Sequence, residues 1–312
     1  MRIPDITFFD TFIKHDRIRE SEIDRFTREL ASGKKILAPS DNTLDTVRSL
    51  RLERLSEEIE TFNRNITTVR NVLDIAESTL GNIVDAAQEV RPEIIRMLNL
   101  GVLDKEDAEI LRDFFQSMRD YILQTANVKV GDSSLFAGVR SQVDAFDENG
   151  VYQGLEQETT IPVANGVELN TNFNGKEYIG VNEKTGKAII IEALDKIIEL
   201  IDSGDISQIN DPLLDVKVNG KDYGKISILE AFDIGLDTIS QHRSMIGEQI
   251  VVADNLKMQH DTLKINFQEL KSSLEDADYA DVITKLEQAK TAYQALLTSI
   301  SQNKDLSLLN YL

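Results

Sequence analysis

Three histidines, His15, His242 and His260, are the side chains best suited to bind a metal or to transfer a proton near neutral pH. The apolar spacing around the last two places both on one helix, about five turns or ~27 Å apart. That separation excludes a metal site built from both within one chain. Solvated or packed histidines are therefore the better interpretation.

Two further groups could carry chemistry, and both have simpler explanations. The acidic run Glu275-Asp276-Ala277-Asp278 lacks the glycine and the spacing of a calcium-binding loop. It stands where a helix begins, so capping and the helix dipole explain it. Lys34 is not a phosphate-binding lysine, because Arg28 occupies the position of the required earlier glycine. The chain has no cysteine, which excludes disulfides and thiolate catalysis. We predict no catalytic, cofactor or metal site, and hence no enzyme.

Composition narrows the possible partners. The 312 residues carry a net charge of −20 without a basic patch, so nucleic-acid binding is not expected. No apolar run approaches the ~18 residues that span a membrane, so membrane insertion is not expected. The N-terminus lacks the basic and apolar regions of a secretory signal. These features suit a cytoplasmic protein or one exported by a route that reads another signal.

The elements are organised around one long helix. From residue 52 to residue 90, apolar residues recur at alternating spacings of three and four, which is the seam of a coiled coil. Such a helix is roughly 60 Å long and needs partner helices. Pro92 is predicted to end it, and Ser40 or Asp41 to cap its start. The seam residues are Leu52, Leu55, Ile59, Phe62, Ile66, Val69, Leu73, Ala76, Leu80, Ile83, Ala87 and Val90.

Outside this long helix, the spacing of apolar residues along the chain changes twice. An amphipathic helix is predicted over residues 1–30, and another begins near residue 104. The middle of the chain alternates about three Asn-Gly pairs, which favour hairpins, and one helix is predicted over residues 188–202. From residue 226 the long-helix pattern returns, interrupted by Arg243 and His260. The three pairs are Asn165-Gly166, Asn174-Gly175 and Asn219-Gly220.

This nearly palindromic layout predicts an α+β fold that is mainly α. Long antiparallel, coiled-coil-like helices from both termini form a rod, with a small β-rich domain inserted in the middle. We divide the chain into three parts. Residues 1–43 and 272–312 pair as terminal helices of an inner-tube domain. Residues 44–134 and 226–271 form the rod, and residues 135–225 form a β-rich outer domain with one helix.

Both ends carry a resemblance to a known family. The N-terminal segment Ser32-Gly33-Lys34-Lys35-Ile36, followed by Pro39-Ser40-Asp41, resembles the signature of bacterial flagellins and their hook-associated relatives. So do the segment 276–281 near the C-terminus and the segment 135–138 in the middle. The ending Leu306-Ser307-Leu308-Leu309-Asn310-Tyr311-Leu312 resembles the hook–filament junction proteins of that superfamily. Asn42, Thr43 and Asn310 depart from the family pattern, which has an acidic residue, a proline and an aspartate there.

The resemblance implies a structural subunit of the bacterial flagellum, forming a junction ring between hook and filament. Its partners would be further copies of itself, the hook-side junction protein, flagellin, and an export chaperone on the C-terminal region. It would be secreted by the flagellar type III system without a cleaved signal peptide.

Apolar side chains of the terminal helices would then mediate self-assembly: Phe8, Phe12, Ile23, Phe26, Leu297, Ile300, Leu308 and Leu309. Two other functions compete with the junction subunit. One is flagellin itself, which the C-terminal ending disfavours. The other is a non-flagellar coiled-coil protein of adhesion or secretion.

Overall fold

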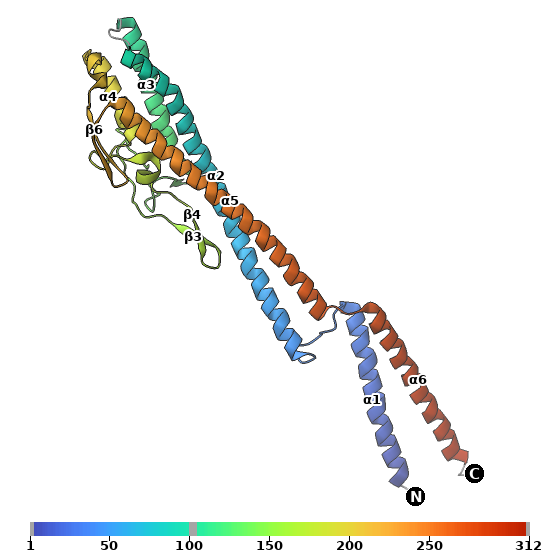
Figure 1. Ribbon diagram of the computed structural model, residues 1–312. Helices are drawn as coiled ribbons and strands as arrows, with labels where there is room; N and C mark the ends of the chain where they lie inside the picture. Colours follow the sequence, from blue (N-terminus) through green and yellow to red (C-terminus); the bar gives the residue numbers. More distant parts are fainter. Residues whose placement is uncertain (1–2, 100–104, 310–312) are drawn as a thin grey trace. The chain divides into compact units, whose positions relative to one another are not determined.

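The computed structural model describes the backbone of residues 3–99 and 105–309, with side chains over 10–98 and 106–302 (Figure 1). The chain divides into two compact units. The terminal unit comprises residues 1–58 and 261–312, and the central unit comprises residues 59–260. The boundary falls within two long helices, α2 (Thr43–Asn99) and α5 (Ile228–Glu275). Each unit is described by itself.

The terminal unit is helical. α1 (Ile3–Ser32) and α6 (Tyr279–Leu309) pack side by side, and the unit also includes the first turns of α2 and the last turns of α5. α1 ends at Gly33, whose φ of +70° is the left-handed conformation expected of a helix C-cap. The predicted N-terminal helix is thus confirmed.

The cap of α2 is Asn42 and not Ser40 or Asp41, so the predicted cap was wrong. The Asn42 side-chain oxygen accepts the Asp45 N–H at 3.1 Å, as an N-cap does. Asp41 instead accepts the N–H groups of Leu37 and Ala38, at 3.0 and 2.8 Å. The Asp41 carboxylate therefore stabilises the preceding turn, which leaves the next residue to begin the helix.

Pro92 does not end α2, which continues to Asn99. The three-four spacing of apolar residues also continues beyond the proline, through Ile94 and Met97, and both are fully buried. A proline inside a helix costs roughly 3 kcal/mol. Burying two more large side chains offsets that cost, at about 1.5–3 kcal/mol each. Tertiary packing therefore overrides the local signal that led to the wrong prediction.

In the central unit, α2 and α5 run antiparallel. Arg91 Nε donates to Asp233 at 2.7 Å, and Arg70 Nε donates to Asp254 at 3.1 Å. The later residue of α2 thus pairs with the earlier residue of α5, as antiparallel helices require. α3 (Lys105–Ala126) packs against α4 (Ile189–Ser203), and α4 ends at Gly204 with φ +78°. The prediction of a helix at 188–202 is confirmed.

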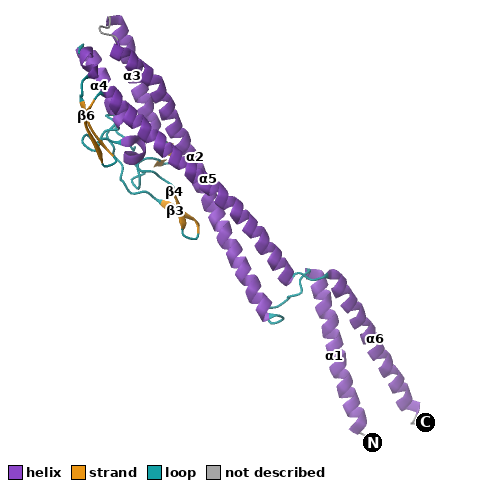
Figure 2. Ribbon diagram, in the orientation of Figure 1, coloured by secondary structure: helices purple, strands orange, loops and turns teal. Residues whose placement is uncertain are grey.

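Three two-stranded antiparallel sheets make up the β structure of the described residues (Figure 2). Two of them are the hairpins predicted at Asn165-Gly166 and Asn219-Gly220. Asn174-Gly175 forms no hairpin, so that prediction was wrong. Gly175 is right-handed (φ −57°), and Asn174 accepts the N–H groups that open a π-helical turn. The remaining elements are β1 (Lys129–Val130), β2 (Ser133–Ser134), β3 (Thr160–Ala164), β4 (Val167–Asn170), η1 (Lys176–Gly180), η2 (Ile206–Asn210), β5 (Leu214–Val218) and β6 (Lys221–Ile226).

One apolar core joins the helices and hairpins of the central unit. It contains the inward faces of α2 and α5, most of α4, and five fully buried phenylalanines. Long helices from both ends of the chain and small antiparallel sheets in its middle are the predicted fold class, which is confirmed. The finer division into three parts stays a prediction. Within the described ranges, no helix is both long and apolar enough to cross a membrane.

Candidate assembly site

The structure describes five of the eight predicted assembly side chains. Phe12, Ile23 and Phe26 on α1 and Ile300 on α6 are half-buried, and Leu297 is 44% exposed. The fully covered contacts between helices of this unit include other α6 residues, among them Val282, Leu286 and Ala289. The side chains of Phe8, Leu308 and Leu309 lie outside the described part. Within one chain, the terminal helices therefore pair while part of their apolar surface stays open.

The two terminal signatures meet in space, although about 240 residues separate them in sequence. Lys34 and Asp276 form an antiparallel β-bridge. Lys35 N–H donates to the Glu275 carbonyl at 2.7 Å, and Ala277 N–H donates to the Gly33 carbonyl at 2.9 Å. We call residues 32–35 with 275–279 the clasp. It ties the α1–α2 connection to the α5–α6 connection.

Side chains reinforce the clasp. Lys34 Nζ pairs with Glu275 Oε2 at 2.6 Å, and Lys35 Nζ donates to the Ser273 carbonyl at 2.8 Å. Ser49 on α2 also donates to the Glu275 carboxylate. A Cβ at position 33 would stand 2.8 Å from the Tyr279 hydroxyl oxygen. The positive φ favours glycine there, whereas the exposed Tyr279 side chain could move aside for a Cβ.

The environment of Glu275 favours its charged form. Partial burial by itself raises the pKa of this carboxyl, because burial disfavours charge. The hydrogen bonds from Lys34 and Ser49 and the charge of Lys271 outweigh burial, so the pKa is lowered. The same hydrogen bond raises the pKa of the Lys34 ammonium. Lys34 and Glu275 therefore form an ion pair within the clasp, in which both side chains are charged over a wide pH range.

The predicted seam is covered progressively along α2. Leu52, Leu55 and Phe62 are half-buried. The other nine predicted seam residues are at most 7% exposed: Ile59, Ile66, Val69, Leu73, Ala76, Leu80, Ile83, Ala87 and Val90. Their role as the seam of the rod stays a prediction. The two residues that interrupt the seam on α5 have structural partners. Arg243 Nε donates to Glu77 at 2.8 Å beside Gly81, and the His260 ring stacks on Phe62 at 5.8 Å.

His242 is buried and ends a ladder of aromatic rings. Its Nδ1 lies 2.9 Å from the Thr238 carbonyl, and its Nε2 lies 3.5 Å from the Glu177 carboxylate. Ring centroids are 4.8 Å apart between His242 and Tyr178, and 5.0 Å apart between Tyr178 and Phe173. The ladder holds the π-helical turn against α5. Among the described residues, no group of three His, Cys, Asp or Glu side chains could hold a metal.

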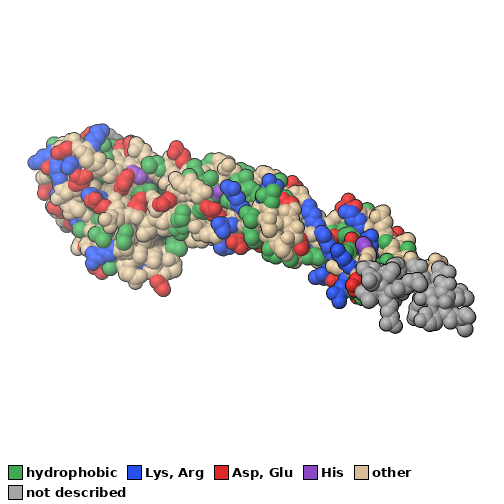
Figure 3. Space-filling model, turned by 90° about the horizontal axis from the view of Figure 1, so that it is seen from below, with side chains coloured by type: hydrophobic (Ala, Val, Ile, Leu, Met, Phe, Trp, Pro, Cys, Tyr) green, Lys and Arg blue, Asp and Glu red, His purple; other side chains and the backbone are tan. Residues whose placement is uncertain are grey.

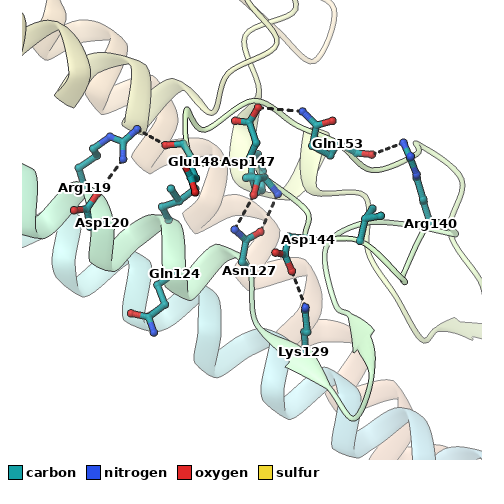
Figure 4. A pocket seen from close by; sticks show the side chains of 13 residues that line it. Arg119, Asp120, Gln124, Asn127, Lys129, Arg140, Asp144, Asp147, Glu148 and Gln153 are labelled. Atoms are coloured by element: carbon teal, nitrogen blue, oxygen red, sulfur yellow. Dashed lines mark hydrogen bonds and ion pairs between the residues drawn. The ribbon is translucent and has the colours of Figure 1, made fainter.

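A polar groove of about 1000 Å³ lies between the end of α3 and the loop that follows β2 (Figure 4). Most of its polar side chains already bind one another. Asn127 donates to the Phe146 carbonyl and accepts the Phe146 N–H, both at 2.8 Å. Lys129 pairs with Asp144 at 2.7 Å. Arg119 pairs with Asp195 at 2.7 Å and with Asp120 at 2.9 Å. The Asn127 and Lys129 contacts fix the loop beside the end of α3, and the Arg119–Asp195 pair joins α3 to α4.

Sequence reasoning missed the clasp, the Asn42 cap and the place of Arg243 over Gly81. The clasp could have been anticipated from the sequence, because both of its strands are segments that resemble the same family.

Figure 3 shows acidic and basic side chains interspersed with apolar ones over the visible face.

Comparison with known proteins supports this architecture. Residues 15–141 match the family described as the bacterial flagellin N-terminal helical region. Sequence comparison with curated proteins gives no significant match. A structure described as a flagellar hook-associated protein from Vibrio parahaemolyticus superposes with a TM-score of 0.62 at 18% identity, over 76% of this chain and 100% of that one. Bacillus cereus FlgL superposes with a TM-score of 0.58 at 17% identity, over 71% of this chain and 99% of that one.

Residues 15–141, with the N-terminal half of the clasp among them, thus match the model of the flagellin N-terminal helical region, in a chain that shares the fold of solved flagellar hook-associated proteins.

Proposed function

We propose that this protein is a structural subunit of the bacterial flagellum that stands at the hook–filament junction. The observation that carries the proposal is the paired terminal helices, which keep apolar side chains partly open and are held by the clasp. The flagellin N-terminal region and the shared fold support a flagellar role. The resemblance of residues 306–312 to the junction proteins favours the junction over the filament.

The terminal helices would assemble with further copies of the chain into a ring. Phe12, Ile23, Phe26, Leu297 and Ile300 would complete their burial between subunits, together with Phe8, Leu308 and Leu309. Fully burying an exposed apolar side chain gives about 1.5–3 kcal/mol, so completing the burial of several partly buried ones per subunit favours association. The parts of the chain at 44–134 and 226–271 would form the surrounding rod, with residues 135–225 outside.

The ring would contact the hook-side junction protein on one side and flagellin on the other. The chain would reach this place through the flagellar type III apparatus, with an export chaperone on its C-terminal region. Completing the burial of the paired terminal helices on assembly would couple their stability to incorporation. No step requires catalysis.

Immunogold electron microscopy of intact flagella tests the location, with an antibody against residues 135–225. We expect label in one narrow band at the hook–filament boundary. Label along the whole filament would make the chain a flagellin, and flagella without label would exclude a flagellar role.

A matched pair of variants tests assembly through α6. Leu297→Asp places a charge on a 44%-exposed apolar side chain, whereas Ser301→Asp places the same charge one turn further on, at an exposed polar position. We expect loss of incorporation for Leu297→Asp alone, with the far-UV circular dichroism of both variants unchanged. Equal incorporation of the two would contradict assembly through this surface.

A further inference from the structure

The start of α2 carries an exposed surface that is apolar and basic. Leu44, Val47 and Leu50 are 59%, 65% and 57% exposed, and Arg51 and Arg54 continue the same helix face at spacings of three and four. Runs of exposed large apolar side chains mark interaction sites. We call these five residues the α2 patch.

The two arginines of the α2 patch make no ion pair with any described residue. Two of the acidic residues near them in sequence have other partners. Asp45 pairs with Arg48 at 3.4 Å and binds Asn42, and Glu53 pairs with Lys271 at 3.2 Å. The patch therefore offers two arginines that no ion pair among the described residues occupies beside an apolar strip, with Glu57 and Glu58 one turn beyond Arg54, in a chain whose net charge is −20.

A surface of opposite character lies at the start of α6. Tyr279 and Ile283 are 55% and 45% exposed, and Glu287 follows one turn later with no ion pair to the described residues. Asp276 and Asp278, both exposed, precede this helix. We call Tyr279, Ile283 and Glu287 with these two aspartates the α6 patch.

We infer that the α2 patch of one copy binds the α6 patch of a second copy. This inference rests on the proposed self-assembly and names the surfaces it uses. Copies of a chain with charge −20 repel each other, so association requires local charges of opposite sign. The two patches supply them around two apolar centres. Both patches are exposed in the single chain, so neither covers the other there.

The contact uses two different surfaces and is therefore heterologous. Each copy keeps one free α2 patch and one free α6 patch after it binds a neighbour. Contacts of this kind produce closed rings or open helical assemblies, rather than isolated dimers.

The absence of cysteine in the chain allows a clean cross-linking test. Full-length Val47→Cys and full-length Ile283→Cys are mixed under mild oxidation. We expect a disulfide-linked mixed dimer. Leu155→Cys, 50% exposed in the outer part of the chain, replaces Val47→Cys as the matched control and should give little mixed product with Ile283→Cys. An intramolecular Lys34→Cys/Asp276→Cys disulfide, across the β-bridge, reports that oxidation is effective.

Charge reversal tests the electrostatic part. Arg51→Glu with Arg54→Glu in the Val47→Cys chain should reduce the yield of mixed dimer by about tenfold or more. Glu287→Arg in the Ile283→Cys chain should restore part of that yield. The inference is overturned if mixed dimer does not exceed the Leu155→Cys control while the intramolecular disulfide forms. It is equally overturned if Val47→Cys cross-links only to itself, because that contact would be isologous.

The outcome is separable from the proposed function. A mixed cross-link with no immunogold label on flagella would leave the contact standing and remove the flagellar role. A labelled junction without the cross-link would keep the role and exclude these two patches.

Discussion

Two glycines on α5 allow the packing of the central unit to be measured with one substitution type. A Cβ built at Gly235 would stand 2.7 Å from Ile190 Cγ1 and 3.4 Å from the Ile190 backbone nitrogen. A Cβ built at Gly247 would meet nothing within 4 Å. Both residues lie inside the same helix. Gly235→Ala and Gly247→Ala therefore differ in packing and hardly at all in local conformation.

The expected magnitudes follow from two opposing terms. Alanine is favoured over glycine in a helix interior by about 1 kcal/mol, which applies at both positions. At Gly235 the new methyl group overlaps Ile190, which is 1% exposed and cannot move aside freely. Overpacking of a buried site costs about 1–3 kcal/mol. We expect Gly247→Ala to raise the free energy of unfolding by about 1 kcal/mol and Gly235→Ala to lower it by up to about 2 kcal/mol.

Urea unfolding followed by far-UV circular dichroism gives both values against the unmodified chain. A double-mutant cycle with Ile190→Ala isolates the contact, because that background removes Cγ1. In the Ile190→Ala background, Gly235→Ala should stabilise the protein, as Gly247→Ala does in the unaltered chain. If Gly235→Ala stabilises the unaltered background as much as Gly247→Ala does, the close approach of α4 to α5 is refuted.

Three further perturbations address the terminal unit and α2. Glu275→Gln should cost about 1 kcal/mol or less at neutral pH, since Lys34 is half exposed. Because the pKa of Glu275 is lowered on folding, its contribution is present above the usual value of 4.5 and is lost as pH falls through the folded pKa, so urea curves of the variant and the parent should converge in acid. Asn42→Ala should cost about 1 kcal/mol through the lost N-cap, seen as faster amide exchange at the start of α2, whereas exchange there is unchanged in Ser40→Ala. Pro92→Ala should stabilise α2 by about 1 kcal/mol or more in thermal unfolding, and a destabilised variant would show that the proline is needed where it stands.

Periodicity predicted the long helices well because burial repeats along them. From Ile66 to Val90 the three-four spacing coincides with side chains that the structure covers. The same reasoning failed at Pro92, where a local rule was applied although the apolar spacing continued to Met97. Weighing the apolar residues that keep this spacing on both sides of the proline against the proline itself would have predicted the longer helix.

Asn-Gly pairs show the limit of local turn signals. At Asn219-Gly220 both residues adopt positive φ, as a tight hairpin requires. At Asn174-Gly175 the same dipeptide is largely buried, and a Cβ on Gly175 would lie 2.5 Å from the Phe136 carbonyl oxygen. Here glycine serves the close approach of another segment. Sequence spacing contains no information about that approach, so the dipeptide alone predicted the wrong structure.

In the clasp, the two segments could be identified from the sequence, but their contact could not. Each strand of it was singled out by resemblance, yet the acidic run 275–278 was attributed to capping and the helix dipole. Asp278 does cap α6, accepting the Ala280 N–H at 2.9 Å. Glu275 and Asp276 instead face Lys34 and the β-bridge. Their pairing depends on two chain connections meeting, which no spacing within either segment encodes. The Lys34–Glu275 ion pair allows a test of this pairing. A destabilising charge change in one segment should be rescued by the opposite change in the other. Lys34→Glu with Glu275→Lys should therefore recover most of the stability that Lys34→Glu alone removes.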